Sequence, residues 1–211
     1  MNAYELIICE NYAEEAKRVI EEENFNDVGI SFFPCCCLSS VRDETELTNL
    51  LNRGIEKKIV LLSKGCGFGI VKRPDYKDNE KLSVNCFETC PCFFMNKSLV
   101  DGYIRQGGFV VTSAWVVSWE KHIKKWGFKP ADAGLFFRES VKFIVVLDTG
   151  MHSEFDEKLG ELKSVLKVNV ERVDVGLDYF SFMLSSLILR QKNKYNEEYF
   201  STQILKSNLA S

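Results

Sequence analysis

Short apolar runs alternate with amphipathic stretches along the first part of the chain. The runs at 4–8, 28–33 and 57–63 are rich in Ile, Val, Leu and Phe, and their length is typical of buried strands. Residues 12–24 and 43–54 instead place apolar residues at helical spacing, and the second stretch begins with a capping-box pattern. This β-α-β-α-β series predicts a parallel sheet with right-handed crossovers.

The regular pattern is interrupted over residues 64–81, where glycines, a proline and mixed charges predict a surface loop. A strand over 81–86 follows, then a helix over 96–106 and a strand over 107–113. The next stretch, 114–127, has the spacing of a single amphipathic helix that ends at a glycine.

The strand-helix pattern starts again with strands at 142–148 and 168–175, each followed by an apolar helix. The whole series predicts an α/β protein with a mainly parallel sheet and helices on both faces, Rossmann-like or flavodoxin-like, with a smaller β-α-β-α unit at the C-terminal end. We expect a cysteine-rich α/β unit over 1–139, the smaller unit packed on it over 140–190, and a polar tail or linker over 191–211.

Composition narrows the class of protein. A hydrophobic content of 45% and a charged content of 27% are ordinary for a globular protein. The net charge of −3, without any Lys/Arg-rich run, argues against a nucleic-acid partner. No apolar stretch approaches the length of a membrane span, and the N-terminus does not have the pattern of a signal peptide. We therefore expect a cytoplasmic protein without a membrane partner, in which clustered cysteines serve metal or redox chemistry.

All eight cysteines lie in the first 92 residues, and most of them directly follow a predicted strand. Because the carboxyl ends of parallel strands share one edge of a sheet, we expect the sulfurs of Cys9, Cys66 and Cys86 to converge there, with Cys90 or Cys92 completing the set. Thiolates bind soft or borderline metals, so these residues predict a metal ion or an iron–sulfur cluster, with zinc as the alternative. The competing interpretation is a set of small buried apolar side chains.

The sequence Cys35-Cys36-Cys37 is harder to interpret, because adjacent side chains diverge and only one or two can reach the same metal ion. The pattern gives these cysteines no definite role.

Three tryptophans and a histidine lie on one face of the predicted helix over 114–127. Trp115, Trp119, His122 and Trp126 are separated by four, three and four residues. One interpretation is an aromatic wall that binds a cofactor through Trp115, Trp119 and His122; the other is an aromatic core with a satisfied histidine. The second histidine of the chain, His152, is predicted to be exposed in a loop.

Catalytic motifs are lacking: the sequence contains no GxSxG, HExxH or Walker pattern. The first hypothesis is therefore a sensory or ligand-binding module with a thiolate site for a metal, an iron–sulfur cluster or a metal-containing cofactor. The alternative is a small enzyme that uses such a cysteine-ligated group or a reactive cysteine. A cysteine-rich structural domain is the third possibility.

Three phrases in residues 86–190, GGFVVTSAWVVSWEKHI, LFFRESVKFIVVLDTG and VDVGLDYF, are distinctive. Through them this stretch resembles the cysteine-containing input region, of unknown ligand, at the N-terminus of multidomain sensor proteins of anaerobic microbes. More loosely, the chain is similar to an uncharacterised family of methanogens with strand-end cysteines, which match Cys9, Cys66 and Cys86 here. The resemblance implies sensing, with a PAS or histidine-kinase module as signalling partner.

The helix that begins near Leu177 carries an apolar stripe formed by Phe180, Met183, Leu184, Leu187 and Ile188. We consider two uses for this stripe. It is either a surface that pairs two copies into a homodimer or a surface buried inside the monomer.

Overall fold

The computed structural model describes residues 3–35, 45–54, 57–67 and 79–208, with side chains described as far as residue 194. The strands of these ranges are β1 (Tyr4–Cys9), β2 (Val28–Phe33), β3 (Lys57–Ser63), β4 (Leu82–Phe87), β5 (Gly108–Thr112), β6 (Phe143–Asp148) and β7 (Asn169–Asp174). The helices are η1 (Glu10–Tyr12), α1 (Ala13–Glu22), α2 (Thr45–Asn52), α3 (Lys64–Gly67), η3 (Cys90–Phe93), α5 (Lys97–Arg105), α6 (Ser113–Val117), α7 (Trp119–Lys125), α8 (Pro130–Ser140), α9 (Phe155–Leu166) and α10 (Asp178–Asn208).

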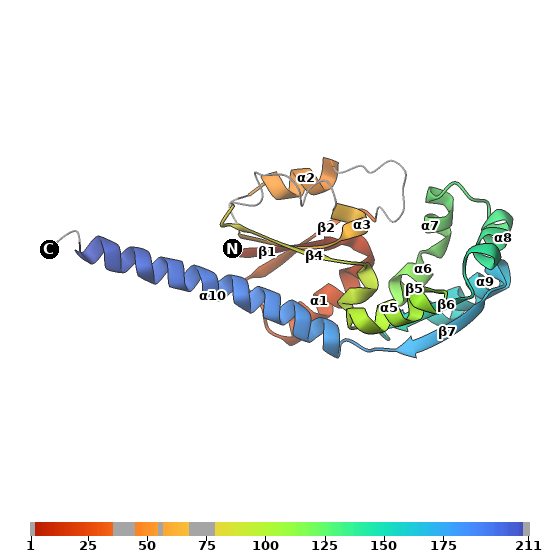
Figure 1. Cartoon of the computed structure of the whole chain (residues 1–211). Helices are drawn as coiled ribbons and strands as arrows, with labels where there is room; N and C mark the ends of the chain where they lie inside the picture. Colours follow the sequence, from red (N-terminus) through yellow and green to blue (C-terminus); the bar gives the residue numbers. More distant parts are fainter. Residues whose placement is uncertain (1–2, 36–44, 55–56, 68–78, 209–211) are drawn as a thin grey trace.

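The strands form two separate parallel sheets (Figure 1). The first has the order β2-β1-β3-β4 and the second the order β5-β6-β7, with parallel pairing throughout. The expected α/β class with parallel sheets and helices on both sides is confirmed. The expected boundary at residue 140 falls between β5 and β6, however, and these two strands pair with each other. The division between the sheets therefore lies before β5.

The first sheet, with the helices that cover it, forms the first lobe. Helix α2 lies on one side of this sheet, and α1 and α10 lie on the other (Figure 1). The central strand β1 buries Leu6, Ile7 and Ile8 completely, so both of its faces are covered. Such a continuous apolar run is what a parallel strand enclosed by helices on both faces requires.

The second sheet and helices α6 to α9 form the second lobe, and β6 ties this lobe to the first. Successive side chains of a strand point to opposite faces. Ile144 and Val146 face the core formed with α6 to α9, whereas Val145 and Leu147 belong to the core shared with the first lobe. All four are fully buried. The two lobes are therefore joined by packed apolar side chains as well as by the chain itself.

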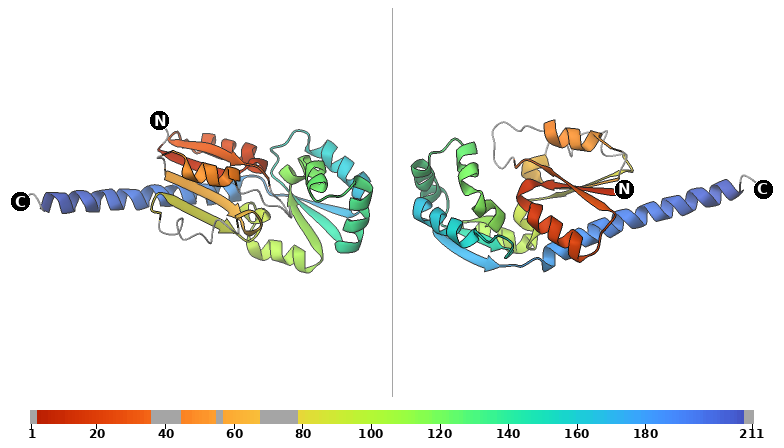
Figure 2. Two further views of the ribbon diagram at one scale, coloured as in Figure 1. Left: turned by 90° about the horizontal axis from the view of Figure 1, so that it is seen from above. Right: turned by 180° about the vertical axis from the view of Figure 1, so that it is seen from behind.

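Helix α10 leaves the second sheet and runs back along the first, as both views of Figure 2 show. Its residues Phe180, Leu184 and Ile188 are completely buried in the shared core. Burial inside the monomer thus accounts for these three positions of the apolar stripe, and pairing of two copies through the helix stays a prediction. No helix of the described residues combines the length and apolar character needed to cross a bilayer.

The stretch expected to form one helix over 114–127 is divided into α6 and α7 at Ser118. Ser118 has φ −108° and ψ 19°, outside the helical range. Its hydroxyl donates to the carbonyl oxygen of Ala114 at 3.0 Å. A serine that bonds back to the carbonyl four residues earlier bends or interrupts a helix, and this explains the break.

Gly134 lets helices α8 and α9 approach each other closely. A Cβ atom at this position would lie 2.7 Å from the carbonyl oxygen of Val165. We expect Gly134→Ala to lower the free energy of unfolding by about 1–3 kcal/mol, since the helices must separate. Gly160→Ala is the control, because its Cβ would meet nothing within 4 Å, and it should stabilise α9 by about 0.5–1 kcal/mol. Urea unfolding of both variants measures this difference; equal midpoints would contradict the packing argument.

Candidate functional site

The parallel order of the first sheet places four cysteines along one edge. Cys9 ends β1, Cys35 follows β2, Cys66 lies in α3 directly after β3, and Cys86 is the penultimate residue of β4. Across the edge their order is Cys35, Cys9, Cys66 and Cys86, because the strand order is β2-β1-β3-β4. The topology therefore gathers cysteines that are up to 77 positions apart in the numbering, Cys9 and Cys86 among them.

The thiols of this edge interact in pairs. Cys9 hydrogen bonds to Cys35, and this bond, with burial, raises the pKa of the Cys9 thiol far above its ordinary value. In the second pair, the hydrogen bond to Cys66 and burial raise the pKa of Cys90 in the same way. Ser63 donates its hydroxyl hydrogen to the Cys66 sulfur at 3.4 Å. Both Cys9 and Cys90 are consequently protonated thiols at neutral pH.

The remaining described cysteines lie outside these pairs. The Cys86 sulfur makes a long contact of 4.0 Å to the carbonyl oxygen of Phe87, and burial raises its pKa. The buried Cys92 lies 3.4 Å from the Thr89 hydroxyl. None of the six described cysteines forms a disulfide.

A metal centre of three or more ligands is not preformed in the described part of the chain. Within it, no group of three or more His, Cys, Asp or Glu side chains is placed to hold a metal ion. The five cysteines predicted as metal ligands are therefore not assembled into one centre in this conformation. Cys36 and Cys37 lie outside the described residues.

A cleft of about 280 Å³ lies between the lobes, next to the Cys9–Cys35 pair. Both histidines of the chain line it, together with side chains of both signs of charge. The lining residues are Glu10, Asn11, Cys35, Ala114, Val117, Ser118, Lys121, His122, Lys125 and His152. Carboxyl ends of strands from both sheets thus contribute to one cleft, which is the usual place for ligands in α/β proteins.

His122 lines this cleft and contacts one of the predicted aromatic residues, Trp115. Its ring stacks on Trp115 at a centroid distance of 5.2 Å and an angle of 4°, and Trp115 in turn contacts Trp126 at 6.0 Å. Trp115 and Trp119 are buried in the core of the second lobe, as the alternative interpretation predicts. The Nε1 atom of Trp119 has no hydrogen-bond partner among the described residues.

The Cys35 sulfur makes the contact of greatest chemical interest. It lies 3.8 Å from Nδ1 of His122, and Asn11 Nδ2 donates to it at 3.4 Å. The main chain of Cys35 is fixed as well, since its N–H donates to Glu10 Oε1 at 3.0 Å and its carbonyl oxygen accepts from Lys125. Cys35, for which the sequence indicated no definite role, is thus the cysteine that contacts His122 in the cleft. The triple cysteine alone gave no signal for this.

His152, predicted to be exposed, is instead mostly buried and belongs to a network between the lobes. Its Nε2 lies 2.9 Å from Oε1 of Glu15, a completely buried residue of α1. The same oxygen accepts from the Thr149 hydroxyl at 2.9 Å, and Thr149 contacts Ser113 at 3.1 Å. The hydrogen bond to Glu15 raises the pKa of His152, although burial alone would lower it. The loop sequence gave no signal for this partner, which is 137 residues away.

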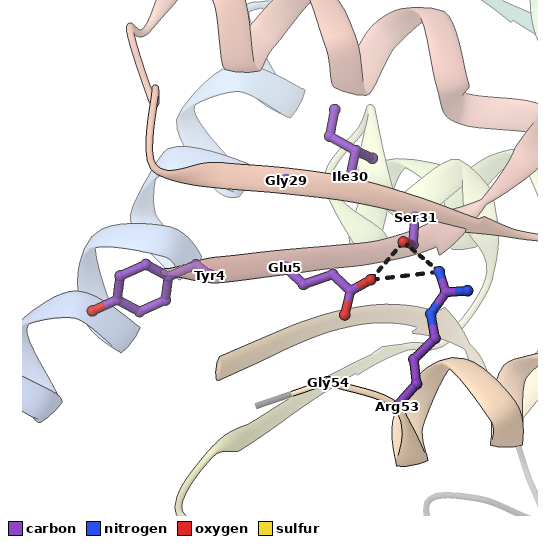
Figure 3. A pocket seen from close by; sticks show the side chains of 7 residues that line it. All are labelled: Tyr4, Glu5, Gly29, Ile30, Ser31, Arg53 and Gly54. Carbon is purple, nitrogen blue, oxygen red and sulfur yellow. Dashed lines mark hydrogen bonds and ion pairs between the residues drawn. The ribbon is translucent and has the colours of Figure 1, made fainter. Parts of the chain in front are cut away.

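A larger hollow of about 390 Å³ lies on β1 and β2, away from the cysteines (Figure 3). Its charged groups satisfy one another. Glu5 accepts from Ser31 at 2.5 Å and lies 3.7 Å from Arg53, which also donates to Ser31 at 3.1 Å. Lys58 lies 3.6 Å from the other oxygen of Glu5. This hollow is therefore a structural ion-pair network, and its size does not make it the stronger site.

Comparison with known proteins gives no further assignment, since no family model, no curated protein and no solved structure matches this chain.

Proposed function

We propose that this chain is a sensory module that binds a small ligand in the cleft between its lobes and detects it through the thiols of Cys9 and Cys35. The observation that carries the proposal is the lining of the cleft, where Cys35 and both histidines meet. The residues come from both lobes, so a ligand that binds them changes how firmly the lobes are held together. An input module needs such a structural change that depends on the bound ligand.

Helix α10 is the element suited to transmit such a change. It starts after β7 of the second sheet, packs on the first lobe and extends beyond that lobe (Figure 1). A difference in the lobe arrangement therefore alters the position of this helix. In the proposal, α10 connects the cleft with a signalling partner of the PAS or histidine-kinase type.

The proposed ligand is a metal ion, and the donor set differs from the one predicted from the sequence. Cys35 and His122 are 3.8 Å apart at their nearest sulfur and nitrogen atoms. Ligands of one tetrahedral zinc ion lie about 3.5–4 Å apart, given metal–ligand bonds of about 2.0–2.3 Å. Cys9 hydrogen bonds to Cys35 and is a third candidate donor. An imidazole and two thiolates suit zinc or monovalent copper, whereas an iron–sulfur cluster would require more of the edge cysteines.

Metal analysis and the visible spectrum of anaerobically purified full-length protein test this proposal, because they separate zinc, a cluster and metal-free protein. We expect one equivalent of zinc to bind in competition with a chromophoric chelator. Cys35→Ser and His122→Ala should each weaken binding by more than about 100-fold, since each removes a ligand. Cys86→Ser is the matched control from the same sheet edge and should bind like the wild type. Equal affinity of all four proteins would contradict the donor set.

A further inference from the structure

The shortest hydrogen bond of the His122 ring favours the tautomer with the proton on Nε2. With its hydrogen directed at the Ala114 carbonyl oxygen, the Ser118 hydroxyl accepts from His122 Nε2, at 3.0 Å. Asn11 Nδ2 is also near Nε2, but at 3.5 Å. The neutral ring then has its lone pair on Nδ1, which faces the Cys35 sulfur. His122 is therefore oriented as a base toward the Cys35 thiol.

This arrangement has the three parts of an activated cysteine: a thiol, a base and a group that orients the base. The stacking of His122 on Trp115 holds the plane of the imidazole. The separation of 3.8 Å between sulfur and nitrogen is long for a hydrogen bond, but such contacts commonly shorten when a reactant binds. Cys35 is thus the candidate nucleophile of the cleft.

Cys9 has a different character from Cys35. It is buried, it hydrogen bonds to Cys35, and it is not among the residues that line the cleft. A small oxidant that enters the cleft therefore meets the Cys35 sulfur first. Cys9, beside it, is well placed to attack once Cys35 has been oxidised.

We propose that Cys35 and Cys9 form a dithiol switch that reacts with small hydroperoxides, with Cys35 as nucleophile, His122 as its base and Cys9 as resolving thiol. The Cys35 thiol loses its proton to His122 Nδ1, and the thiolate attacks one oxygen of hydrogen peroxide. An S–O bond forms, the O–O bond breaks, and His122 returns the proton to the leaving hydroxide as water.

The second step closes the switch. The Cys9 thiol attacks the sulfur of the Cys35 sulfenic acid, an S–S bond forms, and the S–O bond breaks. The proton of Cys9 leaves with the hydroxyl group as a second water. The two thiols are oxidised by two electrons and the peroxide is reduced by two, so the balance needs no further reactant.

The dimensions of the site favour a small oxidant. Cys35 is only 2% exposed, and the cleft of about 280 Å³ is smaller than most cavities for drug-sized ligands, which hold about 300–1,000 Å³. A bulky disulfide would have to open the lobes before it could reach the sulfur. The inference rests on the proposed function only in that the oxidant enters through the same cleft. In the disulfide, the Cys35 sulfur would be bonded to the Cys9 sulfur. It would then no longer be available as a metal ligand beside His122.

The test uses full-length, metal-free protein in chelator, with Cys36→Ser and Cys37→Ser introduced because these thiols lie outside the described residues. One equivalent of hydrogen peroxide should consume two thiols, and peptide mapping should give a Cys9–Cys35 disulfide. Cys9→Ser should instead retain a sulfenic acid at Cys35 that dimedone traps. His122→Gln and the milder Ser118→Ala should slow the reaction at pH 7 by about 10–100-fold. Circular dichroism shows whether these variants are folded.

The control is Cys66→Ser, which removes one thiol of the other pair and should react like the parent protein. A disulfide that maps to Cys66–Cys90, or an unchanged rate in folded Ser118→Ala and His122→Gln proteins, would overturn the switch. This failure is distinguishable from failure of the proposed function, since oxidation is measured without metal and zinc binding without oxidant. Each result can therefore be positive while the other is negative.

Discussion

Replacing Phe180 by alanine is expected to lower the free energy of unfolding by about 3–5 kcal/mol, one of the two largest effects expected of a single change. Phe180 is completely buried where α10 packs on the first lobe, and its ring stacks on Phe94 at a centroid distance of 5.0 Å. Alanine would leave a cavity between α10 and η3 and would remove the aromatic contact as well. Urea unfolding followed by circular dichroism measures the change.

Phe182→Ala is the matched control, because Phe182 lies on the same helix but is 75% exposed. Its effect should stay within about 0.5 kcal/mol. If α10 also pairs two copies through its outer face, Phe182→Ala would instead lower stability in a manner that depends on protein concentration. Equal effects of the two substitutions at a concentration where the protein is monomeric would show that α10 is not docked as described.

The local elements of this fold follow closely from the sequence. The apolar runs over 28–33 and 57–63 have the same bounds as β2 and β3. Each run is a short apolar segment bounded by polar or glycine-containing turns, and the second is buried on both faces. The parallel arrangement followed from the helices between the strands, and it correctly placed the cysteines after β1, β2, β3 and β4 along one edge.

The division of the strands into two sheets could not be predicted from the sequence in the same way. Nothing in the apolar run of β5 indicates whether it extends the first sheet or starts a second one, since both require the same residues. The break at Ser118 was hidden for a similar reason. A serine within an amphipathic pattern is compatible with a continuous helix until its hydroxyl is seen to bond to the Ala114 carbonyl.

The candidate site depends on contacts between residues far apart in the sequence. Cys35 and His122 are separated by 87 positions, and Glu15 and His152 by 137. Neither pair leaves a local motif, so the sequence left His122 between a cofactor site and an aromatic core and gave Cys35 no definite role. Only the meeting of the two lobes brings these side chains to one cleft.

Replacing His152 by alanine is expected to cost about 3–5 kcal/mol at pH 6, because it leaves the carboxylate of Glu15 buried without its cationic partner. Glu15 is completely buried, and its second oxygen already lacks a partner among the described residues. The remaining hydrogen bond from Thr149 cannot replace the lost charge. Glu21→Gln is the control, since that side chain is exposed on the same helix and is not among the charges that raise the pKa of His152.

The pair also predicts how stability depends on pH. The folded protein raises the pKa of His152 above the ordinary value of 6.5, chiefly through the hydrogen bond to Glu15. The folded state therefore binds this proton more tightly than the unfolded chain does. The resulting stabilisation is complete below pH 6.5 and is lost as the pH rises through the folded-state pKa of His152.

Unfolding free energies measured from pH 5.5 to pH 9 should therefore fall with increasing pH in the wild type and in Glu21→Gln. The fall should be much smaller in His152→Ala, which lacks the imidazole that loses the proton. It should also be much smaller in Glu15→Gln, which lacks the negative charge that raises the pKa of His152. NMR titration of the His152 ring reports the pKa directly. A wild-type stability that rises over this range, or a His152 that titrates below 6.5, would show that the two lobes are not held together by this ion pair.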